Sequence, residues 1–385
     1  MKIKLALIVI SCLTLFVLGA CRKSTTNQNT NRNSSAAAPE MSGGGVAPTG
    51  DRYYFRGTIS DKLKIEITLL RDGTRLTGSY FYPKVGKDIG LEGSIDNGGN
   101  FNLQEKDEAG QQTGIFKGKW TQTSNPNESG LSKLQGKWSK PDGSKETTFE
   151  ATQQPVETSS AVRITPKLIK ETNKASHYVI DMEYPQIDGD PRFDKFNRET
   201  RAMITREVAA FKTSATATEA ESGNDVPEEA SNSTLDCSFE FRLLTDDLIS
   251  VQFSESDYGA GAAHPNSYST VLNYDVKNGK RLVLPDLFNA KSNYLKVLSD
   301  YCIKDLKHQS KENDALPEDM IQSGASARAD NYQKWTITSK GLWMIFDPYQ
   351  VGPYAAGPQF VLVPYTVLKD VIKSDGPLGR LVTSA

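Results

Sequence analysis

Apolar and polar residues alternate along the chain from Tyr53 to Thr152, and this pattern restricts the fold more than any other feature. In the segment 63–69, for example, every second residue is Leu or Ile and the residues between them are polar. A period of two indicates strands with one buried side and one solvent-facing side. Turn sequences such as Asp72-Gly73 and Asn97-Gly98 separate the alternating runs.

These runs predict an all-β domain at residues 51–154. Consecutive strands joined by hairpins can close into a barrel, which leaves no unpaired edge. We therefore predict an antiparallel, eight-stranded up-and-down barrel. The predicted strands are 53–60, 64–71, 75–82, 88–95, 99–105, 113–121, 131–139 and 145–152.

Two similar segments, Phe116–Trp120 and Leu134–Trp138, each place a glycine two residues before a tryptophan. The tryptophans could line the mouth of the barrel and stack on a flat ligand, which would make the domain a small-ligand carrier. Alternatively, each glycine makes room for an indole that packs in the barrel. We favour the packing interpretation and keep the carrier as an alternative function.

Residues 161–385 mix helical and strand patterns, which is typical of an α+β domain with helices on an antiparallel sheet. Helices are predicted at 191–212, 292–309 and 365–372, with Asp190 as an N-cap before Pro191. Residues 213–234 have few large apolar side chains and are predicted to be a mobile loop. Strands are predicted at 162–170, 177–184, 235–244, 248–258, 268–274, 280–283, 334–337, 342–346 and 359–363.

The first residues indicate export. A basic start, Met1–Lys4, precedes the apolar run Leu5–Leu18, which is too short to span a bilayer comfortably. Leu18-Gly19-Ala20-Cys21 resembles a bacterial lipobox, so we predict a signal peptide at 1–20. Cys21 is then expected to carry fatty acyl chains such as palmitate. The alternative is an uncleaved anchor helix with a chance cysteine.

A lipid on Cys21 predicts a lipoprotein anchored in the bilayer and facing the periplasm or the cell surface. Arg22 follows the cysteine instead of Asp, which favours the outer membrane if the host is Gram-negative. Residues 21–50 are rich in Ser, Thr, Asn, Ala and Gly and are predicted to be a flexible tether.

Composition and motifs exclude several functions. The chain has 45 basic and 47 acidic residues, so no net charge attracts nucleic acid. We find no phosphate-binding loop and no dinucleotide motif, and we expect no cofactor. Asp188, Asp190 and Asp194 could suggest calcium, but Arg192 stands where a ligand would be needed, and helix capping explains them better.

Two cysteines, Cys237 and Cys302, lie in the predicted exported domain. Thiols in an oxidising compartment commonly pair, so we predict a disulfide between them. The alternative is two free buried cysteines.

Several segments of the second half form an ordered set of motifs: Tyr184–Gly189, Phe196-Asn197, Asp257–Pro265, Thr270–Asp275, Leu284–Phe288, Phe346–Pro358 and Val363–Tyr365. Together they resemble the extracytoplasmic domain of the RsiV family of lysozyme-sensing anti-sigma factors. The resemblance covers about 161–374, and a related module precedes the catalytic domain of some peptidoglycan deacetylases. It implies that surface loops bind lysozyme.

The segment 347–360 carries aromatic residues among glycines and prolines, a composition typical of protein interfaces. We predict a partner-binding site formed by Tyr258, His264, Tyr268, Tyr349 and Tyr354. The expected function is a non-catalytic envelope lipoprotein that binds a lysozyme-like protein or peptidoglycan. The alternative, in which the rings of this segment only cover the edge of the sheet, stays open.

An enzyme is the weaker alternative. His264 follows Ser254, Ser256 and Asp257 and could serve a hydrolase, but the chain has no Gly-x-Ser-x-Gly nucleophile motif. We therefore expect His264 to lie in a turn between two strands.

Overall fold

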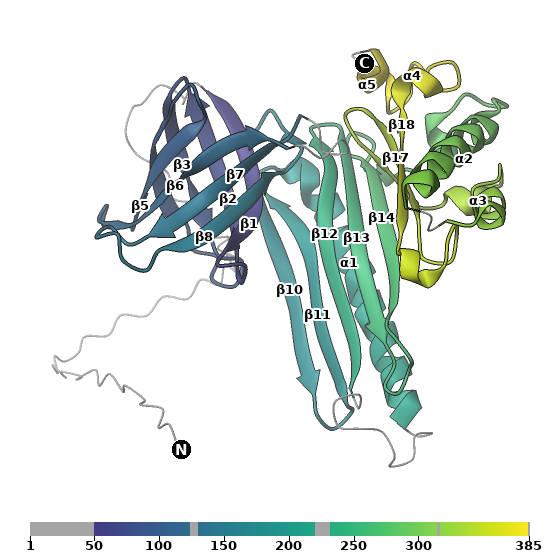
Figure 1. The fold of residues 1–385 in the computed structure, drawn as a ribbon, viewed down its shortest axis with the longest axis horizontal. Helices are drawn as coiled ribbons and strands as arrows, with labels where there is room; N and C mark the ends of the chain where they lie inside the picture. Colours follow the sequence, from purple (N-terminus) through teal and green to yellow (C-terminus); the bar gives the residue numbers. More distant parts are fainter. Residues whose placement is uncertain (1–49, 124–129, 220–231, 314–315, 384–385) are drawn as a thin grey trace, which may run out of the picture. The chain divides into compact units, whose positions relative to one another are not determined.

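A computed structural model describes residues 50–123, 130–219, 232–313 and 316–383 of this chain (Figure 1). The predictions of a signal peptide at 1–20, of acylation at Cys21 and of a tether up to residue 49 lie outside the described residues. Within the described part of the chain, no helix is long and apolar enough to cross a membrane.

The first region is a closed, antiparallel, eight-stranded barrel with neighbours in chain order, which confirms the predicted fold. The last strand pairs with the first, for example at Phe55 and Gln153. The strands are β1 (Asp51–Ile59), β2 (Leu63–Asp72), β3 (Arg75–Phe81), β4 (Ile89–Ile95), β5 (Asn100–Lys106), β6 (Gln112–Gln122), β7 (Ser132–Ser139) and β8 (Thr147–Gln153).

Large side chains fill the interior of the barrel. The ring of Phe116 contacts the rings of Phe149 and Tyr80 edge to face, with centroids 4.9 and 5.4 Å apart. Trp120 is buried, and a Cβ added to Gly136 would lie 2.6 Å from the Cα of Gly118 across the strand pair. Both tryptophans therefore pack in the barrel, but Gly118 and Gly136 make room for each other's backbone, and the glycine beside the Trp138 indole is Gly114. The filled interior counts against the carrier.

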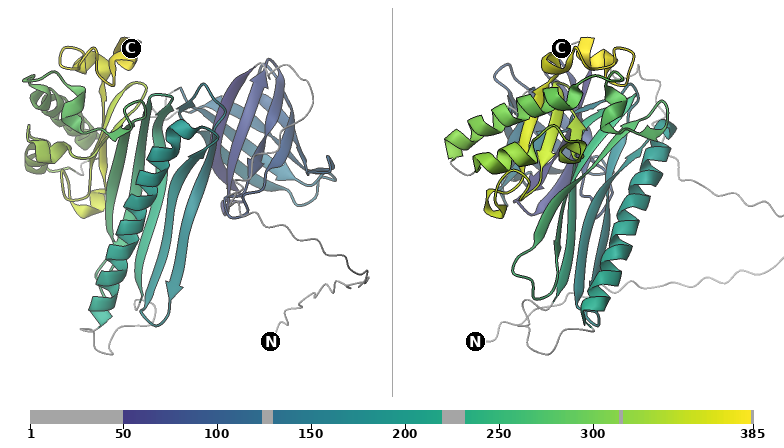
Figure 2. Two further views of the ribbon diagram at one scale, coloured as in Figure 1. Left: turned by 180° about the vertical axis from the view of Figure 1, so that it is seen from behind. Right: turned by 90° about the vertical axis from the view of Figure 1, so that its right-hand side faces the viewer.

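The second region contains a long twisted sheet covered on one face by α1 (Asp194–Glu219), as Figures 1 and 2 show. Its strand order is β10-β11-β12-β13-β14-β15; β11 and β12 are parallel, β9 pairs in parallel with β12, and the other neighbours are antiparallel. The strands are β9 (Val156–Glu157), β10 (Arg163–Asn173), β11 (Tyr178–Asp188), β12 (Ser233–Thr245), β13 (Leu248–Tyr258), β14 (Asn266–Asp275) and β15 (Lys280–Arg281).

Helix α1 differs from its prediction at both ends. A single 3₁₀ turn, η2 (Pro191–Phe193), comes first, and the Asp190 side chain caps it by accepting a hydrogen bond from the Arg192 amide. The helix then continues to Glu219, into the segment predicted to be a loop. Small residues such as Ala215 carry no strong amphipathic signal, yet Ala215 is buried against the sheet.

A second core lies between a three-stranded sheet and a group of helices. The sheet consists of β16 (Trp335–Ile337), β17 (Gly341–Phe346) and β18 (Gln359–Pro364). A buried hydrogen bond joins this sheet to the long sheet: the Ile337 amide donates to Ser250 Oγ at 2.8 Å. The remaining elements are η4 (Leu284–Leu287), α2 (Tyr294–Asn313), α3 (Glu318–Gly324), η5 (Ala329–Tyr332), η6 (Tyr354–Ala356), α4 (Tyr365–Leu368) and α5 (Gly379–Thr383).

The predicted disulfide is wrong. Cys237 and Cys302 are both free and buried. Cys237 packs in the core beneath α1, whereas Cys302 packs in the core of α2 and the three-stranded sheet, so the two thiols belong to different cores. Burial raises the pKa of each thiol above its usual value.

Candidate functional site

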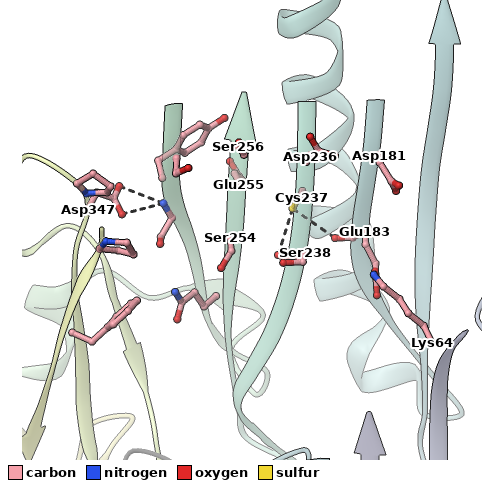
Figure 3. Close-up of a pocket in the computed structure, with 17 residues that line it drawn as sticks. Lys64, Asp181, Glu183, Asp236, Cys237, Ser238, Ser254, Glu255, Ser256 and Asp347 are labelled. Carbon is pink, nitrogen blue, oxygen red and sulfur yellow. Dashed lines mark hydrogen bonds and ion pairs between the residues drawn. The ribbon is translucent and has the colours of Figure 1, made fainter. Parts of the chain in front are cut away.

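The face of the long sheet opposite α1 carries a polar pocket of about 430 Å³, which we call the open-face pocket (Figure 3). Strands β11 to β14 provide most of its lining; Lys64 of β2, the segment after β17, and the start of β18 with the residue before it provide the rest. The lining residues are Lys64, Asp181, Glu183, Asp236, Cys237, Ser238, Gln252, Ser254, Glu255, Ser256, Ser267, Tyr268, Ser269, Asp347, Pro348, Pro358 and Phe360.

Two rows of hydroxyl and carboxylate side chains cross the open face. One row pairs Asp236 with Ser256 and Ser256 with Ser267, and the next pairs Ser238 with Ser254 and Ser254 with Ser269. Side chains alternate along a strand, so all of these residues face away from α1. None of the five serine hydroxyls hydrogen-bonds to another described residue, so they are available to a ligand.

Three of the four carboxylates on this face are paired with lysine. Asp181 pairs with Lys170, Glu183 with Lys64, and Asp347 with Lys334. Glu183 also accepts from the Arg56 guanidinium of the barrel at 2.6 Å, and Asp347 accepts from the amide of Ser269 at 3.1 Å. These pairs fix the carboxylates in place.

Asp236 makes no direct ion pair with a described cation, and Lys170, which pairs with Asp181, acts on it only at longer range. Partial burial and the neighbouring Asp181 raise the pKa of Asp236 above the usual range. The open-face pocket therefore contains one carboxylate whose charge is not compensated by a direct ion pair.

The opposite wall of the pocket is apolar. Pro348, Pro358 and Phe360 line it, and the Phe360 ring stacks on Trp343 with centroids 5.5 Å apart and planes inclined by 19°. Such a wall provides a flat, rigid contact surface next to the hydroxyl rows.

Three aromatic side chains meet on segments that adjoin the pocket lining in the chain, and we call them the aromatic cluster: His264, Tyr349 and Tyr354. His264 and Tyr354 stack with ring centroids 4.2 Å apart, and Tyr349 lies 5.5 Å from Tyr354. The Tyr354 hydroxyl donates to the carbonyl oxygen of Pro265. None of the three lines the pocket, but Tyr349 directly follows Pro348 and His264 lies three residues before Ser267, and both Pro348 and Ser267 do line it.

Tyr349 is held in an unusual conformation. Its side chain is 61% exposed, and its φ of 72° lies in the left-handed region that a bulky residue rarely adopts. Backbone strain of this kind concentrates at binding and catalytic sites.

The structure thus brings together three of the five predicted partner-binding residues. Tyr268 lies apart from them, because its hydroxyl donates to Glu207 Oε1 of α1 at 2.8 Å. Tyr258 lies at the end of β13, where it pairs with Thr234. The serine rows and Asp236 were missed, because polar residues at every second position also describe an ordinary solvent-facing strand.

Beneath the sheet, on the α1 side, lies a buried carboxyl, Glu255, beside the half-buried Glu207. Glu255 is 3% exposed, and neither of its carboxylate oxygens hydrogen-bonds to a described donor. Burial and the neighbouring Glu207 raise the pKa of Glu255 to about 8.

The surroundings of His264 do not form a hydrolase triad. Its Nδ1 lies 2.8 Å from the carbonyl oxygen of Pro265, and its ring face is covered by Tyr354. Ser254 and Ser256 lie on the open face and make no hydrogen bond to it. Among the described residues there is no group of three or more His, Cys, Asp and Glu side chains that could hold a metal ion.

Two family models match this chain. Residues 170–267 match the family described as Deacetylase PdaC, and residues 285–366 match the family described as Protein of unknown function (DUF3298). The chain thus contains PdaC-like and DUF3298 regions, and both contribute to the lining of the open-face pocket.

Among curated proteins, the chain is 25% identical over 183 residues to Peptidoglycan-N-acetylmuramic acid deacetylase PdaC of Bacillus subtilis (strain 168). That match covers 47% of this chain and 37% of the relative. Immunogenic protein MPT64 of Mycobacterium tuberculosis (strain H37Rv) is 26% identical over 113 residues, covering 29% of this chain and 47% of the relative. The chain therefore spans less than half the length of either relative.

Two solved structures of the DUF3298 family are similar to this chain. The protein from Bacteroides fragilis NCTC 9343 has a TM-score of 0.44 and 18% identity, covering 59% of this chain and 99% of that one. The protein from Pseudomonas aeruginosa PAO1 has a TM-score of 0.41 and 15% identity, covering 56% of this chain and 94% of that one.

Proposed function

We propose that this protein is a non-catalytic component of the bacterial cell envelope that binds the glycan of peptidoglycan through its C-terminal region. The observation that carries the proposal is a pocket lined by unpaired serine hydroxyls, with the aromatic cluster on the chain segments that continue from its lining. The similarity to a peptidoglycan deacetylase supports the choice of ligand.

The two parts of the site suit a sugar chain. Aromatic rings and the Phe360 wall can cover the apolar faces of sugar rings, and free hydroxyls and carboxylates can bond to their edges. The loop that carries Tyr349 and Tyr354 contains prolines, and Tyr354 is tied to Pro265, so little entropy is lost on binding.

Co-sedimentation of the full chain, solubilised in detergent, with insoluble peptidoglycan tests this function. Replacing both cluster tyrosines, Tyr349→Ala with Tyr354→Ala, is expected to weaken binding at least tenfold. Val85→Ala is the matched control, because Val85 is an exposed apolar side chain of the barrel. No sedimentation of the unmodified protein above its background without peptidoglycan would reject glycan binding.

A lysozyme-like protein is the second candidate ligand. The exposed ring of Tyr349 next to His264 and Tyr354 favours it, since clustered aromatic side chains commonly anchor protein interfaces. It also agrees with the resemblance to the RsiV family. Titration with lysozyme of the full chain, and of a variant changed in the pocket lining, distinguishes the two ligands. A protein partner held by the aromatic cluster should bind both equally, whereas a glycan held in the pocket should bind the variant more weakly.

We further propose that Cys21 is acylated and anchors the protein to a bilayer, facing the periplasm or the cell surface. Mass spectrometry of the amino-terminal peptide from native membranes is expected to show Cys21 as the first residue with fatty acyl chains. An intact Met1 with no acyl group would overturn the anchor without affecting the proposed ligand.

A further inference from the structure

We infer that the floor of the open-face pocket is a subsite for a primary ammonium group beside sugar hydroxyls. The preferred ligand is then an amino sugar whose nitrogen is free, and not N-acetylated. This inference rests on the proposed glycan binding and specifies which form of the glycan is recognised.

The charge distribution carries the first step. Asp181, Glu183 and Asp347 each already pair with a lysine, whereas Asp236 pairs with none of the described cations. Asp236 is exposed to the pocket, and Lys170, which acts on it electrostatically, already pairs with Asp181, so the Asp236 carboxylate is open to a positively charged ligand group. A primary ammonium can pair with Asp236 and still donate two further hydrogen bonds.

Unused hydrogen-bonding groups carry the second step. Ser269 is 5% exposed and faces the pocket, yet its hydroxyl bonds to no described residue. Gln252 is 4% exposed; its Oε1 accepts from Arg242 at 2.8 Å, while its amide nitrogen donates to no described residue. Both residues line the pocket, so these unpartnered groups are available to a polar ligand there.

The geometry of the sheet carries the third step. Ser256 lies directly opposite Asp236, and Ser254 lies directly opposite Ser238 in the neighbouring row. Adjacent strands are about 4.8 Å apart, which is comparable with the width of a pyranose ring. A sugar placed across Asp236 and Ser256 brings its amine to Asp236 and its hydroxyls to the neighbouring serines.

N-acetylation removes this recognition in two ways. It replaces the cationic amine by a neutral amide, so the ion pair with Asp236 is lost. It also adds a bulky acyl group at the position where the ammonium would approach the carboxylate.

Calorimetric titration of the full chain with a β-1,4-linked glucosamine tetramer and with the N-acetylglucosamine tetramer tests the inference, at a pH where the amine is protonated. The free amine is expected to bind at least tenfold more tightly. Asp236→Asn should abolish that preference, whereas Asp236→Glu should retain most of it. Asp300→Asn is the matched control, because Asp300 is an exposed carboxylate of α2 paired with Lys296.

The other outcomes separate the two levels of the proposal. Equal affinity for the two tetramers would overturn the amine subsite and leave glycan binding intact. Binding of neither tetramer would reject both. Spermidine binding as tightly as the glucosamine tetramer, and equally lost in Asp236→Asn, would show a simple cation site and overturn the assignment to a sugar.

Discussion

Tyr354 stacks on His264 with ring centroids 4.2 Å apart, and this contact joins two motifs that are distant in the sequence. The Tyr354 hydroxyl adds a hydrogen bond to the carbonyl oxygen of Pro265, next to His264 in the chain. The two loops therefore hold each other in place, next in the chain to residues that line the open-face pocket. Tyr349, which packs on Tyr354, is the exposed member of the cluster.

Tyr349→Gly is expected to stabilise the fold and weaken ligand binding at the same time. A tyrosine in the left-handed region costs roughly 1–2 kcal/mol, and glycine avoids this cost while losing part of the gain to its greater freedom in the unfolded state. We expect a net gain of about 0.5 kcal/mol in the free energy of unfolding, measured by urea denaturation.

Tyr349→Ala is the matched variant, because it removes the ring and keeps the strained backbone. Both variants should bind peptidoglycan at least several-fold more weakly, but only Tyr349→Gly should gain stability. Unchanged binding in both variants would show that the exposed ring has no part in recognition.

Local patterns were sufficient to predict the barrel. Each of its strands has a buried side and an exposed side, and each hairpin is short, so alternation and turn residues together determine the order of the strands. The end of α1 could not be read in the same way, because the helix there buries a small residue, Ala215, against the sheet and lacks a stripe of large apolar residues.

The candidate site was predicted only in part, for a physical reason. The loops that carry His264 and Tyr349 were recognisable by their composition, but their contact depends on how β14 and β17 pack. Asp236 and Ser254 belong to strands whose polar residues follow the same pattern as those of any strand with one solvent-facing side. Their significance depends on the apolar wall opposite, which comes from a distant part of the chain.

The two cysteines show how a compositional argument fails. Two thiols in an exported domain suggested a bond, but Cys237 and Cys302 belong to separate cores. We therefore predict that alkylation of the denatured, unreduced protein labels both of them, as seen by peptide mass spectrometry. A reductant should leave the thermal midpoint unchanged. A peptide pair that is linked before reduction and separates after it would contradict the structure.

Glu255→Gln is expected to stabilise the protein at alkaline pH. The carboxyl lies beneath the sheet beside Glu207 and Tyr268, and burial together with Glu207 raises its pKa to about 8, from an ordinary value of 4.5. Between these values the folded state holds a proton that the unfolded state has released. The free energy of unfolding therefore falls as the pH rises through this interval, and the loss is complete above pH 8.

A glutamine keeps the shape of the protonated acid and cannot ionise, so the variant should lose most of this decline. We expect a gain on the order of 2 kcal/mol at alkaline pH and little change at acidic pH, from urea denaturation over a pH series. The free energy of unfolding of the variant should still fall somewhat with rising pH, since burial also raises the pKa of Glu66 to about 7. Glu108→Gln, an exposed carboxylate of the barrel, is the control. If the pH slope of Glu255→Gln equals that of the control, Glu255 does not hold its proton at neutral pH, and α1 packs on the sheet without a protonated carboxyl between them.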